Sequence, residues 1–78
     1  MNKEYRYIAK RAIYEALTGG RKLSQMDCRE FEVEDMRTPI SHMKDDFTRE
    51  GYALNSQWIH TPKGRRIKEY WLERRMQS

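Results

Sequence analysis

Residues 38–72 read TPISHMKDDFTREGYALNSQWIHTPKGRRIKEYWL, and this stretch decides the fold predicted for the chain. Its first part, residues 39–50, carries apolar side chains at the three- and four-residue spacing of an amphipathic helix. Residues 52–59 then follow the two-residue period of a half-buried strand, in which alternate side chains share one face. Residues 67–72 form the returning strand. Pro and Gly between them, at 61–64, favour a turn. The stretch therefore predicts one helix followed by one β-hairpin.

The predicted helix at 39–50 has one apolar and one polar face. Thr38 is its expected N-cap and Pro39 its first helical residue, because proline lacks only an N–H that is unpaired there anyway. Gly51 ends the helix. Three residues form the inward face: Ile40, Met43 and Phe47. The opposite face is polar, with Lys44 on the flank: Ser41, His42, Asp45, Thr48 and Arg49.

Upstream, residues 3–18 predict a first helix that the Gly19-Gly20 pair ends. Seven residues form its wide apolar face: Tyr5, Ile8, Ala9, Ala12, Ile13, Ala16 and Leu17. Tyr7 and Tyr14 lie away from that face, and we expect them to be half exposed or to contact a second copy of the chain.

Residues 21–23 could form a short first strand. Ser24 is a good N-cap, with Asp27 in place of the usual glutamate of a capping box, so a second helix is expected over about 24–31. Met26 or Cys28 would point inward from it. In the hairpin, Tyr70 and Leu72 share one face while Ile67, Glu69 and Trp71 share the other, and either face could be the core face.

The run GGRKLSQMDCREF, the helix ending in REGY, the GRR-type turn and the final EYWL together resemble the small phage and prophage winged helix-turn-helix domains. The resemblance covers roughly residues 12–72 and implies an α+β fold of three helices followed by a two-stranded wing. It also implies that the third helix and the wing bind DNA. We expect one domain over 1–72 and a polar tail over 73–78.

Charge is unevenly distributed along this 78-residue chain, whose net charge is +4. Residues 1–24 carry six Lys/Arg and two acids, residues 25–50 carry four and eight, and residues 51–78 carry six and two. The basic ends suit a polyanion partner. In a winged helix, helix 39–50 would lie in the major groove and the hairpin on the backbone or in the minor groove. The residues expected to contact DNA are then Ser41, His42, Lys44, Thr48, Arg49, Lys63, Arg65 and Arg66.

Other features bear on this hypothesis. Asp45 and Asp46 oppose tight non-specific binding, although a lone acid can accept from cytosine. We expect Arg49, Lys63, Arg65 and Arg66 to lie side by side. Four residues of the first helix could reach flanking phosphates: Lys3, Arg6, Lys10 and Arg11.

An alternative function comes from the acidic turn at 30–35, whose carboxylates could mimic phosphates and bind a host nucleic-acid enzyme. These are Glu30, Glu32, Glu34 and Asp35. The chain could also form a homodimer through Tyr7 and Tyr14 of the first helix, since tight specificity from so small a domain favours pairing on a two-fold site.

Several classes are not expected. No phosphate loop, metal-ligand pair or nucleophile with a base is present in the sequence, so we predict no enzyme and no cofactor. The single Cys28 and two histidines are too few for a zinc site. No apolar run approaches the ~20 residues of a membrane span. A cytoplasmic protein is expected.

Overall fold

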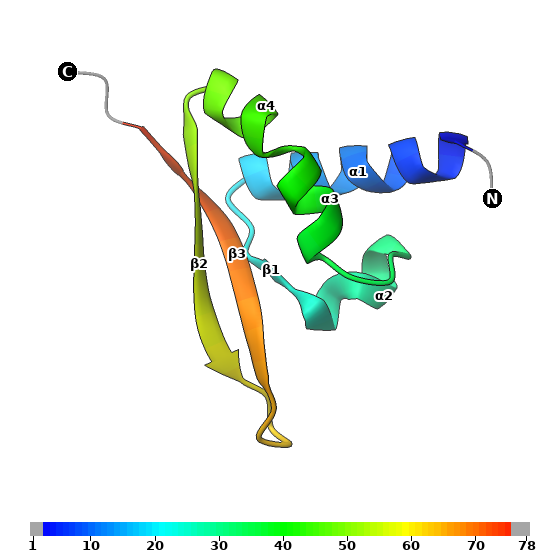
Figure 1. The fold of residues 1–78 in the computed structure, drawn as a ribbon, viewed down its shortest axis with the longest axis vertical. Helices are drawn as coiled ribbons and strands as arrows, with labels where there is room; N and C mark the ends of the chain where they lie inside the picture. Colours follow the sequence, from blue (N-terminus) through cyan, green and yellow to red (C-terminus); the bar gives the residue numbers. More distant parts are fainter. Residues whose placement is uncertain (1–2, 76–78) are drawn as a thin grey trace.

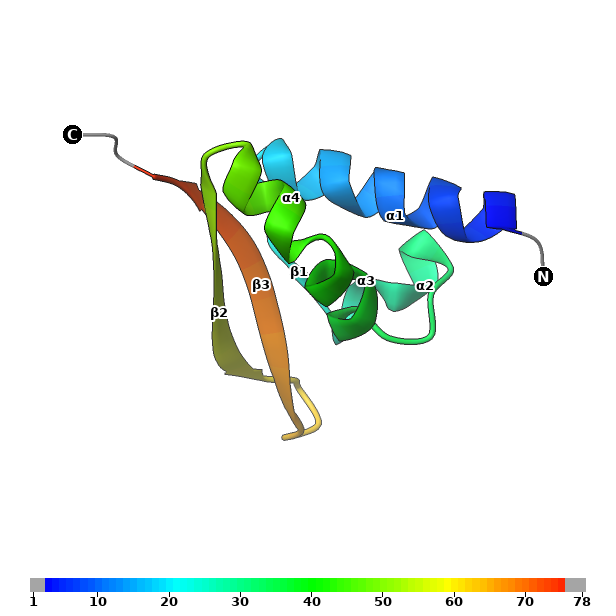
Figure 2. The same ribbon diagram turned by 45° about the horizontal axis from the view of Figure 1, so that its top comes forward.

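The structure is a computed structural model that describes residues 3–75, with side chains from Ile8 onward. It is an α+β fold in which four α-helices lie on one side of a three-stranded antiparallel sheet, and the hairpin of β2 and β3 extends beyond the helices (Figure 1; Figure 2). The elements are α1 (Lys3–Thr18), β1 (Leu23–Ser24), the 3₁₀ turn η1 (Gln25–Asp27), α2 (Cys28–Phe31), α3 (Arg37–His42), α4 (Lys44–Arg49), β2 (Tyr52–His60) and β3 (Arg66–Arg74).

Helix α1 has the bounds predicted from its periodicity. It ends in paired backbone bonds, in which Gly20 N–H donates to the carbonyl of Leu17 and Arg21 N–H to that of Ala16. The buried face differs from the expected one, because Ile8 is 66% exposed while Tyr14 packs against the core. Apolar residues span a wide arc of this helix, and its packing against α2, α3, β3 and the Phe47 ring selects which part of the arc is covered. Tyr5 lies outside the described side chains.

The region after α1 confirms Ser24 as an N-cap, but the single helix expected over about 24–31 is divided into η1 and the short α2. Ser24 Oγ accepts from Met26 N–H at 3.2 Å, and the Asp27 carboxylate accepts from Ser24 N–H at 2.8 Å, completing the capping box. The short strand expected at 21–23 is present as β1, displaced to Leu23–Ser24. Of the two inward candidates, Cys28 is buried and Met26 is 63% exposed.

The helix predicted at 39–50 differs in two ways. It begins earlier, at Arg37, because the Asp35 carboxylate accepts from Thr38 N–H at 2.7 Å, so Thr38 lies inside the helix and is not its cap. It is also divided into α3 and α4 at Met43, whose N–H is shared between the carbonyls of Pro39 and Ile40. Such a tightened turn interrupts regular α-helix. The expected inward residues are nevertheless buried: Ile40, Met43 and Phe47.

The hairpin is a nine-residue pair in unbroken register, from Tyr52 opposite Arg74 to His60 opposite Arg66. Thr61 and Gly64 shape its loop, since Gly64 N–H donates to the Thr61 carbonyl at 2.9 Å and Gly64 has a φ of 85°. The sequence did not decide which face of the hairpin packs on the core, and the structure does. The residues packed on the core are Tyr52, Leu54, Tyr70 and Leu72.

The core lies between the helices and this face of the sheet. Its fully or nearly fully buried members are Ile13, Leu17, Leu23, Cys28, Met36, Ile40, Met43 and Phe47. Leu23 of β1 lies opposite Tyr70, which makes β3 the central strand in the order β1-β3-β2. Strand β3 continues through Arg74, two residues into the predicted tail, and residues 76–78 of that tail lie outside the described residues.

Candidate nucleic-acid interface

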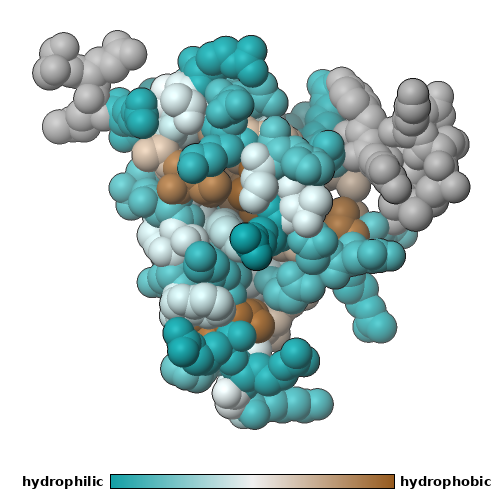
Figure 3. All heavy atoms as spheres, in the orientation of Figure 1, coloured by the Kyte–Doolittle hydropathy of each residue, from teal (hydrophilic) through white to brown (hydrophobic). Residues whose placement is uncertain are grey.

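The hairpin end of the molecule concentrates positive charge. Between Trp58 and Lys68 the chain has four Lys/Arg and no Asp or Glu. Lys63, Arg65 and Arg66 are all exposed, and Figure 3 shows predominantly hydrophilic residues over this end. The loop that carries them is fixed by Thr61, whose N–H donates to the Arg65 carbonyl at 2.8 Å and whose hydroxyl accepts from Arg65 N–H at 3.1 Å. The charges are therefore held on a defined turn.

Trp58 adds an exposed aromatic ring to this basic hairpin. It is 56% exposed and lies directly opposite Lys68 across the strands. The guanidinium carbon of Arg66 is 4.8 Å from the ring centroid, and Lys68 Nζ is 5.4 Å from it. A cation over an exposed ring gains roughly 0.5–1 kcal/mol. The ring therefore restrains both cations on the helix-side face of the hairpin.

Sequence reasoning selected Arg66 but missed Trp58 and Lys68. The predicted turn would have been enough to place these residues. A three-residue loop at 62–64 sets His60 opposite Arg66 and Trp58 opposite Lys68. The even-numbered residues of β2 also share one face with Leu54. Counting outward from the turn would thus have brought Trp58, Arg66 and Lys68 together.

The polar candidates on the helices are all exposed: Ser41, His42, Lys44, Thr48 and Arg49. Two of them already have partners on α4. Thr48 Oγ1 donates to the Lys44 carbonyl at 3.1 Å, and Arg49 Nη2 forms an ion pair with Asp46 Oδ1 at 2.5 Å. Ser41 and His42 lie on α3, which is nearer the hairpin tip than α4 is (Figure 1; Figure 2).

The expectation that Arg49 lies beside the hairpin cations is wrong. Arg49 ends α4, immediately before β2, whereas Lys63 follows the far end of that strand. Nine strand residues at ~3.3 Å each place roughly 30 Å between the two ends. Sequence adjacency to the hairpin concealed this separation, because the helix joins β2 at the end opposite the tip.

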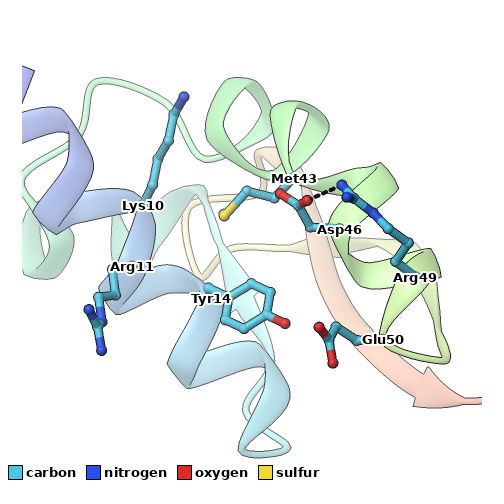
Figure 4. A pocket seen from close by; sticks show the side chains of 7 residues that line it. All are labelled: Lys10, Arg11, Tyr14, Met43, Asp46, Arg49 and Glu50. Atoms are coloured by element: carbon cyan, nitrogen blue, oxygen red, sulfur yellow. Dashed lines mark hydrogen bonds and ion pairs between the residues drawn. The ribbon is translucent and has the colours of Figure 1, made fainter.

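A shallow hollow lies between α1 and α4 (Figure 4). It is lined by Lys10, Arg11, Tyr14, Met43, Asp46, Arg49 and Glu50. The Tyr14 hydroxyl points toward Glu50, and the pKa of Tyr14 is raised first by burial and then by that carboxylate. Both signs of charge line the hollow, so it lacks the uniform positive charge that phosphates favour. Lys3, Arg6 and Tyr7 lie outside the described side chains.

Carboxylates of the acidic turn interact with other residues of the chain. Glu30 accepts from both terminal nitrogens of Arg21, at 2.5 and 2.6 Å, and this pairing lowers its pKa. The Asp35 carboxylate accepts from Thr38 N–H at the start of α3, which lowers the pKa of Asp35. Glu32 ends α2 with a φ of 56°. These contacts hold the turn in place and make Glu30 and Asp35 less available to an outside partner.

Comparisons with protein-family models, curated proteins and solved structures returned no match to this chain. Over residues 3–75, no helix has both the length and the apolar character that crossing a membrane requires. Among the same residues, no three His, Cys, Asp or Glu side chains gather in a way that could hold a metal ion.

Proposed function

We propose that the protein is a winged helix-turn-helix domain that binds double-stranded DNA sequence-specifically, as a phage-type transcriptional regulator or recombination accessory factor. The element order supports this proposal, because α2 and α3 are joined by a short turn and followed by the β2–β3 hairpin. In such domains the second helix of the motif enters the major groove and the hairpin lies along the backbone or the minor groove. The strand order β1-β3-β2, with a short strand after α1, agrees with that architecture.

The observation that carries the proposal is the hairpin itself. It extends beyond the helical body, carries Lys63, Arg65, Arg66 and Lys68, and has no acid between Trp58 and Lys68. Phosphate contacts by such cations release counterions and supply much of the affinity for DNA. Arg66 and Lys68 are restrained over the Trp58 ring, so less side-chain freedom is lost when they meet phosphate.

On the helical side, α3 supplies Ser41 and His42 as candidates for base edges, and Lys44 follows at the start of α4. Thr48 and Arg49 belong to the end of α4 that is remote from the hairpin loop, so we expect them to contribute less to DNA binding. The protein-interaction alternative is less well supported, because Glu30 and Asp35 of the acidic turn are engaged within the chain.

The test is duplex DNA binding over a salt series, with two variants of equal charge change. The double substitution Lys63→Ala and Arg65→Ala removes cations from the hairpin loop. Its control, Arg74→Ala with Arg75→Ala, removes two exposed cations at the other end of β3. We expect the hairpin variant to weaken binding and to flatten the log–log salt slope by roughly 0.9 per lost phosphate contact, and the control to do neither. Equal effects of the two variants, or a slope near zero for the unmodified protein, would rule the proposal out.

A further inference from the structure

Strand β2 is an edge strand without the usual protection. It lies at one side of the sheet, and no other described element lies beside its outer edge (Figure 1; Figure 2). Its sequence, YALNSQWIH, contains no Lys, Arg, Asp or Glu over nine residues, although 28 of the chain's 78 residues are charged, 16 basic plus 12 acidic. It also contains no proline and no bulge. Edge strands normally carry charged residues, proline or a bulge, because each of these prevents the strand from pairing with another chain.

The ladder determines which backbone groups of β2 remain open. Thr61 N–H donates to the Arg65 carbonyl, and Arg75 N–H donates to the Gly51 carbonyl. Bonded and non-bonded pairs alternate in an antiparallel ladder, so the odd-numbered residues of β2 bond to β3. The even-numbered residues therefore direct N–H and C=O groups toward the outer edge: Tyr52, Leu54, Ser56, Trp58 and His60.

We propose that β2 is a homodimer interface, at which two copies of the chain pair antiparallel about Ser56 and form one continuous six-stranded sheet. This inference does not depend on DNA binding. In this register every outward-directed residue meets an outward-directed residue of the second copy, and each one donates and accepts one backbone hydrogen bond. No even-numbered position is left without a partner, which singles out Ser56 as the centre.

The side chains of β2 are complementary to themselves in this register. Leu54 lies opposite Trp58 of the second copy on the helix-side face, and Ala53 lies opposite Ile59 on the other face. Aliphatic–aromatic cross-strand pairs of this kind stabilise sheets. Asn55 meets Gln57, and Ser56 meets itself. A second copy fits this strand because it brings no charge to an interface that has none.

The helices leave room for the second copy. Helix α4 packs against β2, and the covered part of the strand is its first half, where Tyr52 and Leu54 pack on the core. Ser56, Gln57 and Trp58 are exposed. Antiparallel pairing places the uncovered half of one β2 beside the covered half of the other. Trp58, 56% exposed in one copy, would then have an apolar neighbour, while Arg66 and Lys68 contact its ring from the β3 side.

The experiment is sedimentation across a concentration series of the full chain. Ser56→Pro removes the central N–H, which does not bond to β3, so the monomer keeps its ladder. We expect it to weaken dimerisation roughly 30-fold, the equivalent of ~2 kcal/mol for two lost hydrogen bonds. Ser56→Lys is the second variant, in case proline disturbs folding, because it sets like charges directly opposite each other. The control Met26→Lys adds the same charge at an exposed residue of η1, which follows β1 at the opposite edge of the sheet, and should leave the dimer intact.

Amide hydrogen exchange identifies the interface directly. In the dimer, the amides of Leu54, Ser56 and Trp58 should exchange slowly, and they should exchange rapidly in Ser56→Lys. A protein that stays monomeric at every concentration overturns the proposal. So does a dimer whose even-numbered β2 amides exchange rapidly, or a dimer that Ser56→Pro and Ser56→Lys both leave intact. Slow exchange of those amides in a monomer bound to an added extended peptide would assign the edge to a peptide and would also overturn it.

Discussion

Tyr14 and Phe47 stack with their ring centroids 5.3 Å apart and their planes inclined by 11°, which joins α1 to α4 through one aromatic pair. Phe47 is fully buried, whereas Tyr14 is partly buried and reaches the hollow between the two helices. Residues 33 positions apart in the chain thus form a contact that fixes the first helix against the last one. The Tyr14 ring, which the sequence pattern placed on the side of α1 away from its apolar face, packs against the core.

The first prediction concerns this aromatic pair. Tyr14→Leu keeps apolar bulk but loses the stack, so the free energy of unfolding should fall by about 1 kcal/mol. Tyr14→Phe should stay close to the unmodified protein, because the ring is retained. Ile8→Ala, on the exposed part of the same helix, is the control and should change stability by less than about 0.5 kcal/mol. Urea denaturation measures all three, and equal losses for Tyr14→Leu and Ile8→Ala would contradict the role given to the stack.

The second prediction separates the real cap from the apparent one. Ser24→Ala removes the hydroxyl that accepts from Met26 N–H and should lower the free energy of unfolding by ~1 kcal/mol. Thr38→Ala should have a smaller effect, because it keeps the backbone N–H that donates to Asp35 and removes only the exposed hydroxyl that also contacts this carboxylate. Thermal unfolding of the two variants gives the comparison. A larger loss from Thr38→Ala than from Ser24→Ala would contradict this assignment.

The third prediction concerns acid stability. The pKa of Asp35 is lowered chiefly by the hydrogen bond that its carboxylate accepts from Thr38 N–H. Because the folded-state pKa lies below the unfolded value, this carboxylate contributes stability above the unfolded pKa and loses it as the pH falls through the folded pKa. Asp35→Asn keeps an acceptor for the cap but does not titrate. Its stability should therefore fall less steeply on acidification than that of the unmodified protein.

Chemical denaturation at a series of acidic pH values measures that difference. Glu30 contributes to the same acid limb, since the bidentate bond from Arg21 lowers its pKa. Glu30→Gln should flatten the limb further when it is combined with Asp35→Asn. Parallel pH profiles for Asp35→Asn and the unmodified protein would show that Asp35 has no shifted pKa.

The fourth prediction distinguishes the two ends of β2 in DNA binding. Arg66→Gln removes a hairpin cation held over Trp58 and should weaken duplex binding while lowering the salt slope by roughly one. Arg49→Gln removes the same charge at the remote end, where Arg49 is paired with Asp46, and should have a smaller effect. Fluorescence anisotropy with labelled duplex at several salt concentrations makes the comparison. A larger loss for Arg49→Gln would place the DNA against α4 instead.

Local signals in the sequence were sufficient for several elements. The periodicity of α1, the Ser24 and Asp27 capping box, the end of the helix at Gly51 and the turn at 61–64 each depend on residues only a few positions apart. Local energetics therefore fix them, and the structure has them where they were predicted. Thr38 was misjudged because Asp35, three residues earlier, competes for the same helix start.

What the sequence by itself determined, then, is a helical region followed by a β-hairpin, the burial of Ile40, Met43 and Phe47, and the basic, acid-free hairpin loop. Only the tertiary structure decided which face of the hairpin is buried, that Tyr14 stacks on Phe47, that Trp58 lies beneath Arg66, and that Arg49 is remote from the hairpin loop. The physical reason is range. Caps, turns and periodicity act over a few residues, whereas burial and charge clustering depend on which distant segments pack together.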